Sequence, residues 1–191
     1  MKKACAFFLL IVMLLLMEVP QNNPRIRLQS QSLIHQPVTE VWEQLSDLSQ
    51  VQNYVPFVSG SNINTDQKKG EGVQRTVWLK KRRTVQEEVI EWDDGQGYVL
   101  RLNDASFFLP FHDMETRYHI DPDDELGLQS DLTITLTVRP RFGLLGRWFM
   151  TPWITTRLQR QLDELADGIK YHFETGLQVS EDVQVVFPHP E

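Results

Sequence analysis

Several residue types and motifs that mark common protein classes are missing from this 191-residue chain. The one cysteine, Cys5, cannot form a disulfide within the chain or supply a cysteine-rich metal site. It also precedes the apolar N-terminal run, whereas a lipoprotein cysteine would follow it. No His-x-x-x-His pair, nucleophile elbow or phosphate-binding loop occurs. The sequence therefore predicts no metal and no cofactor.

Basic residues are also in short supply. The chain has 19 Lys and Arg against 26 Asp and Glu, a formal net charge of −7. Because phosphate contacts need clustered Lys and Arg, we expect no nucleic-acid partner. The single basic run, Lys80-Lys81-Arg82-Arg83, lies between two strand-like segments. It is interpreted as a solvated hairpin end, with a phosphate or lipid-headgroup contact as the alternative.

The N-terminus has the layout of a targeting segment. Lys2 and Lys3 precede an unbroken apolar run over residues 4–17, which is long enough for a signal peptide but short for a span of about 20 residues. No small-x-small cleavage pattern follows Met17, so an uncleaved anchor with the domain outside stays open. We expect residues 1–24 to be a signal peptide or membrane anchor plus linker, and the protein to be membrane-associated or exported. A cytoplasmic protein with an uninserted leader is the alternative.

The middle of the chain alternates between strand and short-helix patterns. Residues 25–34 alternate with period two, which predicts a half-buried strand, and Val38 to Leu45 place apolar residues on one helical face. A second short helix is expected over 48–54. Turn signals such as Asp93-Asp94-Gly95 separate the later strands. The expected strands lie around residue 63 and over 73–81, 84–92, 98–102, 114–120 and 128–138.

A long helix is predicted at the C-terminal end. Thr151 can act as the N-cap and Pro152 as the first helical residue. Apolar residues from Ile154 to Phe173 then recur every three or four positions, which gives a buried stripe. Gly176 is a suitable helix stop. Residues 177–191 are expected to form a flexible tail.

The order of elements predicts an α+β domain, because short links favour an antiparallel sheet whose apolar face needs a helical cover. Four motifs lie along residues 25–176: Pro37-x-x-x-Val41-Trp42-x-x-Leu45-x-Asp47-Leu48, Tyr54-Val55-Pro56-Phe57-Val58, Gly70-x-Gly72-x-x-Arg75 and Glu88-Val89-x-x-Trp92. With these motifs the chain resembles the START-like superfamily, also called SRPBCC. The resemblance implies one domain over 25–176 with a helix-grip fold: a curved antiparallel sheet of about six or seven strands wrapped around a long C-terminal helix, with two short helices after the first strand.

The resemblance also implies a class of ligand. Members of the superfamily bind lipids, quinones, hormones or polyketides, and the coenzyme Q-binding-like and polyketide-cyclase-like branches both stay open here. We therefore expect a hydrophobic small molecule in a cavity between sheet and C-terminal helix. A cyclase or hydratase acting on such a ligand is one alternative, and a protein-interaction module without a ligand is another. The matching motifs are fold motifs, so no catalytic residue is assigned.

Aromatic side chains are the candidate ligand contacts, with ordinary core packing as the alternative for each. The apolar segment 107–111 is interpreted as a lid or membrane-touching tip, or as a loop buried by residues 142–150. His112 and Asp113 are adjacent on a strand and so would point to opposite faces, which favours solvent. The polar candidates for the cavity are His112 and Glu88, with Arg75 or Arg101 as partner of Glu88. The aromatic candidates are Trp78, Tyr98, Phe107, Phe108, Phe111, Tyr118, Trp148 and Trp153, with Leu100 beside them.

Overall fold

A computed structural model describes residues 25–80, 83–103, 111–140 and 143–179 of the chain. The expectations for residues 1–24, 104–110 and 180–191 lie outside these ranges. The elements in chain order are β1 (Ile26–Ile34), α2 (Val38–Leu45), η1 (Leu48–Gln50), α3 (Val51–Tyr54), β2 (Val58–Ile63), β3 (Gln74–Leu79), β4 (Arg83–Asp93), β5 (Gly97–Asn103), β6 (Phe111–Pro122), β7 (Ser130–Pro140) and α4 (Gly143–Thr175). Each expected strand and helix is present.

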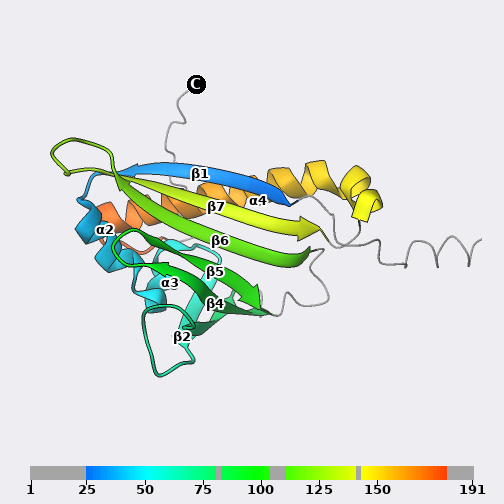
Figure 1. Cartoon of the computed structure of the whole chain (residues 1–191), viewed down its shortest axis with the longest axis horizontal. Coiled ribbons are helices and arrows are strands. Elements are labelled where there is room, and N and C mark those ends of the chain that lie inside the picture. The colour runs from blue at the N-terminus through cyan, green and yellow to red at the C-terminus, as the bar shows by residue number, and fades with distance from the viewer. Residues whose placement is uncertain (1–24, 81–82, 104–110, 141–142, 180–191) are drawn as a thin grey trace, which may run out of the picture.

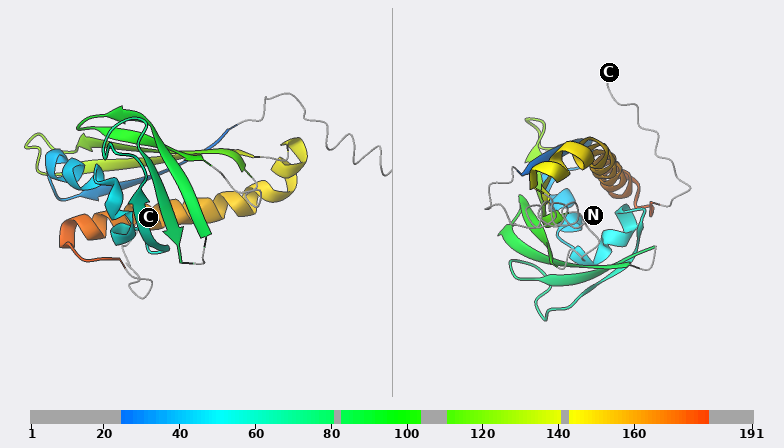
Figure 2. Two further views of the ribbon diagram at one scale, coloured as in Figure 1. Left: turned by 90° about the horizontal axis from the view of Figure 1, so that it is seen from below. Right: turned by 90° about the vertical axis from the view of Figure 1, so that its right-hand side faces the viewer.

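The seven strands form one antiparallel sheet in the order β1-β7-β6-β5-β4-β3-β2. Strands β2 to β6 each lie next to the following strand in the chain, and β1 pairs with β7, the last strand. The short helices connect β1 to β2, which lies at the opposite edge of the sheet. The sheet curves, and α4 runs along its concave side (Figures 1 and 2). This is the predicted helix-grip arrangement.

Strand alternation decides which side chains face the interior. In β1 and β7, Ile26 lies opposite Val138 and Leu28 opposite Leu136, so both strands place apolar residues on the concave face. A β-bulge in β4 between Val89 and Glu91 shifts the alternation by one residue. Trp92 therefore faces inward, where its ring stacks on Tyr98 with 5.7 Å between centroids.

Helix α4 begins earlier than the sequence indicates. It starts at Gly143, so Pro152 lies inside the helix and the predicted start at Thr151 is wrong. A proline removes one backbone hydrogen bond but a helix can continue through it with a bend. Figure 2 shows the N-terminal part of α4, in yellow, turning away from the rest. The predicted stop is confirmed, because Gly176 has φ of 70° and its N–H donates to the His172 carbonyl at 2.7 Å.

Side chains of α4 also bond to the outer edge of the sheet at β1. Gln159 Nε2 donates to the Gln29 carbonyl at 3.0 Å, and Lys170 Nζ donates to the Leu33 carbonyl. These carbonyls belong to an edge strand, whose unpaired backbone groups could otherwise pair with another chain. The contacts fix α4 along β1. Within the described residues, no helix is long and apolar enough to cross a membrane.

The two ends of the sheet differ in their cover. We call the end with the helices α2, η1 and α3 the closed end, and the opposite end, where β1 and α4 begin, the open end (Figure 1). The β3–β4 and β5–β6 connections lie at the open end, and the β4–β5 and β6–β7 turns at the closed end. The right-hand view of Figure 2 looks toward the open end, with the sheet and α4 around the interior.

Candidate ligand-binding site

Exposure along the concave face changes from one end of the sheet to the other. At the closed end, Ile120, Leu132 and Ile134 are at most 1% exposed. At the open end, inward-facing apolar residues of four neighbouring strands are only half-buried, and so are two residues of α4 that pack on the same core. We call this set the open-end apolar surface: Leu79, Val85, Leu102, Met114, Ile154 and Leu158.

A buried ion pair lies on the same concave face, on neighbouring strands β3 and β4. Arg75 and Glu87 are paired in the strand register, and Arg75 Nε donates to Glu87 Oε2 at 2.7 Å. The Arg75 side chain is only 3% exposed, and its Nη1 also donates to the Leu48 carbonyl at 2.8 Å. Burial works to lower the pKa of Arg75, but the Glu87 carboxylate and the neighbouring Tyr54, Tyr98 and Tyr118 together outweigh it, and the net shift is upward. The guanidinium therefore stays charged inside the fold.

Glu87 is the more exposed residue of the Arg75–Glu87 ion pair. Its side chain is 23% exposed, against 3% for Arg75, and it lies beside Leu102, its partner in the register of β4 and β5. A carboxylate oriented by a buried guanidinium is a fixed hydrogen-bond acceptor. The pair can therefore bind a hydroxyl or amide hydrogen of a ligand.

Three buried tyrosines surround this ion pair and separate it from the closed end. Burial raises the pKa values of Tyr54, Tyr98 and Tyr118, so all three phenols stay neutral. Tyr98 Oη donates to the Leu45 carbonyl at 3.3 Å, and the rings of Tyr98 and Tyr118 are 4.9 Å apart. These hydrogen bonds and ring contacts make the tyrosines part of the core.

The predicted aromatic contacts fall into three groups. Tyr98 and Tyr118 are 2% and 6% exposed, and Leu100 is equally buried, so their positions match core packing. Trp78 is 42% exposed and lies on the outer face, since it alternates with the inward-facing Arg75 and Val77. Its expected place inside the cavity is therefore wrong. Phe107 and Phe108 lie outside the described residues, as do the side chains of Phe111, Trp148 and Trp153.

The polar candidates need one correction. Glu88 lies on the outer face opposite Arg101 and accepts a hydrogen bond from Asn103 Nδ2 at 2.7 Å, so it does not point inward. Arg101 instead pairs with Glu115 at 3.0 Å. The side chain of His112 lies outside the described part of the chain. The inward carboxylate is Glu87, which alternation with Val85 and Val89 could have identified.

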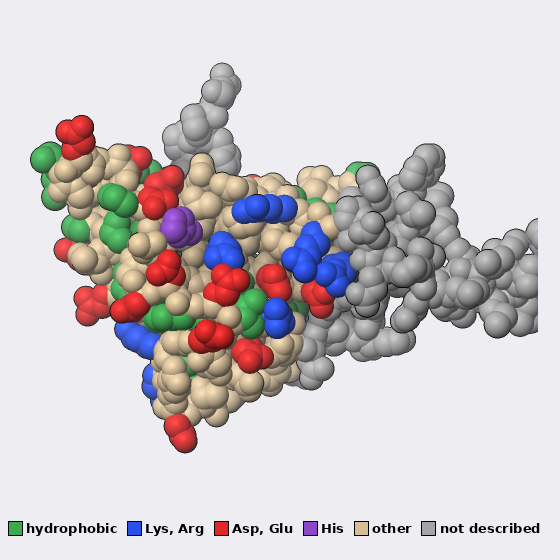
Figure 3. Space-filling model, in the orientation of Figure 1, with side chains coloured by type: hydrophobic (Ala, Val, Ile, Leu, Met, Phe, Trp, Pro, Cys, Tyr) green, Lys and Arg blue, Asp and Glu red, His purple; other side chains and the backbone are tan. Residues whose placement is uncertain are grey.

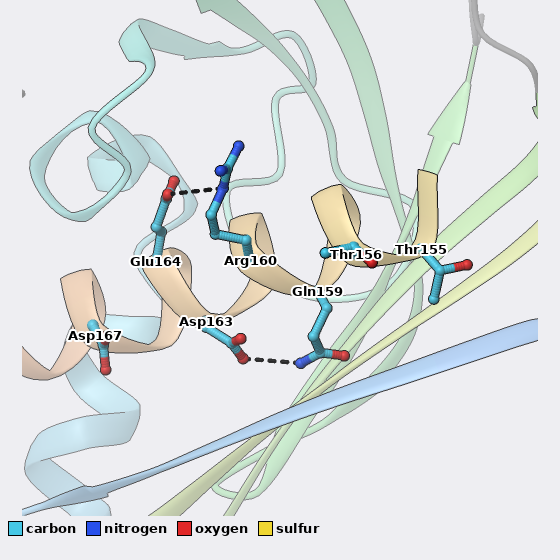
Figure 4. Close-up of a pocket in the computed structure, with 7 residues that line it drawn as sticks. All are labelled: Thr155, Thr156, Gln159, Arg160, Asp163, Glu164 and Asp167. Carbon is cyan, nitrogen blue, oxygen red and sulfur yellow. Dashed lines mark hydrogen bonds and ion pairs between the residues drawn. The ribbon is translucent and has the colours of Figure 1, made fainter. Parts of the chain in front are cut away.

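A separate groove of about 520 Å³ runs along the polar side of α4 (Figure 4). In it Gln159 donates to Asp163 at 2.9 Å, and Arg160 lies 3.7 Å from Glu164. The residues that line it carry hydroxyl, amide or charged groups: Thr155, Thr156, Gln159, Arg160, Asp163, Glu164 and Asp167. Within the described ranges, no three His, Cys, Asp or Glu residues come together as a metal site.

The family follows from the sequence. The family model described as "Polyketide cyclase / dehydrase and lipid transport" matches residues 25–174. The chain belongs to this family. The description of the family supports binding of a hydrophobic small molecule as the general function. The search of curated protein sequences returned no match.

Solved structures agree on the fold of this family member. A START superfamily protein from Mycobacterium smegmatis is 14% identical with a TM-score of 0.61, over 78% of this chain and 97% of that one. The major latex-like protein 151 of Panax ginseng is 16% identical with a TM-score of 0.61 and the same coverages. The protein TTHA0849 from Thermus thermophilus is 17% identical with a TM-score of 0.60, again over 78% and 97%. At these identities the likeness extends to the fold alone.

Proposed function

We propose that this protein binds a lipid-, quinone- or polyketide-like molecule between the concave face of the sheet and α4, at the open end. The half-burial of the open-end apolar surface carries the proposal. Removing apolar surface from water is favourable by about 25 cal/mol for each Å². A ligand that covers the half-exposed side chains inside the curved sheet would therefore be stabilised by burying them. The general ligand class of the family supports the same assignment.

The Arg75–Glu87 pair supplies the polar end of the proposed site. Apolar pockets fix a ligand's orientation with a few placed polar groups, and Glu87 is a carboxylate already held in one position. A ligand with a hydroxyl or other donor at one end can bond to Glu87 while its apolar body covers Leu102 and Met114. The proposed ligand is therefore amphipathic, with a hydrogen-bond donor.

No specific contact among the described residues favours the cyclase or hydratase alternative. That alternative needs at least two inward-facing polar groups, for instance His112 with Glu88, and Glu88 lies on the outer face. The general function stays binding or carriage of the ligand.

The test compares two adjacent positions on β4 that face opposite sides of the sheet. Val85→Trp would fill the open-end apolar surface, whereas Gln86→Trp adds the same ring on the exposed outer face. Binding is measured with a fluorescent fatty acid titrated into the full chain, and bound molecules are extracted and identified by mass spectrometry. We expect Val85→Trp to weaken binding about tenfold or more, equivalent to about 1.4 kcal/mol, and Gln86→Trp to leave it unchanged. Equal effects at both positions, or no binding to the unsubstituted chain, would overturn the proposal.

A further inference from the structure

The charges of this acidic protein are unevenly distributed between its two ends. The two closed-end turns, residues 93–97 and 121–131, contain Asp and Glu but no Lys or Arg. Figure 3 shows acidic side chains at the left-hand, closed end, with basic ones below them, and basic and acidic side chains together beside the grey atoms at the right. Burial and the neighbouring Asp123 and Asp121 raise the pKa of Asp131.

The open end has the opposite charge. Its exposed side chains include arginines at the start of β1, cations at both ends of the β3–β4 connection, and the exposed ring of Trp78 two residues before Lys80. Toward this end, Glu87, Asp113 and Glu115 each pair with an arginine, at 2.7 Å, 3.1 Å and 3.0 Å, and Glu88 accepts a hydrogen bond from Asn103. We call the exposed set the basic rim: Arg25, Arg27, Trp78, Lys80 and Arg83. Cations with a neighbouring tryptophan suit the interface of an anionic bilayer.

The apolar run at residues 4–17 enters the domain at the same end. Residues 18–25 join it to β1 and span at most about 28 Å when fully extended. The nine residues of β1 are about 30 Å long, so this tether is no longer than the sheet itself. Insertion of residues 4–17 in a membrane would thus hold the start of β1, and with it the basic rim, near the lipid surface.

We propose that the open end of this protein docks on a bilayer containing anionic lipid, through the basic rim, with the acidic closed end pointing into water. The docked surface is an interface with lipid headgroups. It places the open-end apolar surface beside the membrane, the source of amphipathic ligands, but docking does not require a bound ligand. The acidic closed end would be repelled by the anionic lipid, which opposes docking through that end.

The experiment measures orientation, because the apolar run alone could bring the whole chain to a membrane. In full-length protein with Cys5→Ser, one cysteine is introduced either at the rim (Thr84→Cys) or at the closed end (Leu126→Cys, where Leu126 is 80% exposed) and labelled with a fluorophore. The label is quenched by a quencher attached to lipid headgroups, in vesicles of phosphatidylcholine with and without phosphatidylglycerol. We expect strong quenching at residue 84 only, dependent on phosphatidylglycerol and reduced by salt.

Charge variants complete the test. Arg25→Gln and Arg83→Gln should each lower the docking equilibrium at residue 84 about fivefold. Lys68→Gln is the matched control, since Lys68 is an exposed cation in the β2–β3 connection at the other end of β3. Equal quenching of both labels, no quenching of either, or the same result without anionic lipid would overturn the proposal. Fatty-acid binding in the absence of vesicles, measured in parallel, shows whether the ligand site survives independently.

Discussion

The closed and open ends of the sheet are built from the same strands, yet only one of them is fully packed. On β6, Ile120 at the closed end is 1% exposed, while Met114 near the open end is half-buried. On β7, Leu132 and Val138 are both 0% exposed, so the difference lies in the strands from β6 to β3. The difference comes from what lies over each end, since the inward residues at both ends are apolar. Stability is thus concentrated at one end, which leaves the other available for binding.

The closed end is packed by the segment between β1 and β2. Trp42 of α2 contacts Trp92, with ring centroids 5.0 Å apart, and Tyr54 of α3 contacts Phe173 of α4. Helices α3 and α4 approach so closely that a Cβ on Gly168 would lie 2.2 Å from the Tyr54 carbonyl oxygen. Glycine at this position therefore permits the contact that closes this end of the fold.

The largest expected effect is on the free energy of unfolding, when a leucine is replaced by alanine at each of the two ends. Leu132→Ala should lower the free energy of unfolding by about 3–4 kcal/mol, because it leaves a cavity in a packed core. Leu102→Ala, at the half-buried open end, should cost only about 1 kcal/mol. Urea denaturation of both variants, with fitted m-values, measures the two losses. Equal losses would show that the open end is packed as tightly as the closed end and would remove the basis of the comparison.

The Arg75–Glu87 pair lies where the two regions meet, and a second prediction tests it. Glu87→Gln should cost about 2 kcal/mol, because it leaves a buried guanidinium without its counter-charge. Arg75→Met combined with Glu87→Leu should restore most of that loss, since apolar replacement of a buried pair is often neutral. Urea denaturation of the single and double variants measures both changes.

Glu88→Gln is the control for these variants. Glu88 is next to Glu87 in the chain, but its carboxylate lies on the outer face and accepts a hydrogen bond from the Asn103 amide. We expect a change within about 0.5 kcal/mol for it, as for most surface substitutions. Similar losses for Glu87→Gln and Glu88→Gln would contradict the assignment of Glu87 as the inward residue.

Local sequence patterns predict the fold. They predict only in part which face of a strand each side chain lies on. The apolar spacing of Val38 to Leu45 indicated both bounds of α2, and Gly176 marked the end of α4. Trp78 is expected to line the cavity because it is aromatic, although it shares its face of β3 with Gln74 and Thr76. Alternation would have placed it outside, and the same rule would have selected Glu87 over Glu88.

Other features have no local signal. The bulge in β4 that turns Trp92 inward depends on pairing with β5, which no single strand reveals. Thr151-Pro152 has the composition of a helix start, but α4 continues through it from Gly143. The half-burial at the open end depends on where α2 and α3 lie in space. Local patterns thus predict elements, while exposure depends on the assembled fold.

The smallest expected effect is a pH dependence at the closed end. Glu174 of α4 accepts hydrogen bonds from the backbone N–H of His35 at 2.9 Å and from its ring at 2.7 Å. Burial works to raise the pKa of Glu174, but these bonds and Lys170 outweigh it, so the pKa is below its ordinary value of 4.5. The ionised form is therefore favoured by folding. Its contribution is complete above pH 4.5 and is lost as the pH falls through the lowered value.

We therefore expect Glu174→Gln to lower the free energy of unfolding by less than about 1 kcal/mol at neutral pH, and by progressively less in acid. Urea denaturation of both proteins from about pH 7 to pH 3 measures the difference. Glu164→Gln is the control, since Glu164 is a more exposed carboxylate of the same helix, 3.7 Å from Arg160, and should show little change. A difference for Glu174→Gln that grows in acid would contradict the lowered pKa. It would also show that the contact between α4 and the end of β1 does not depend on this charge.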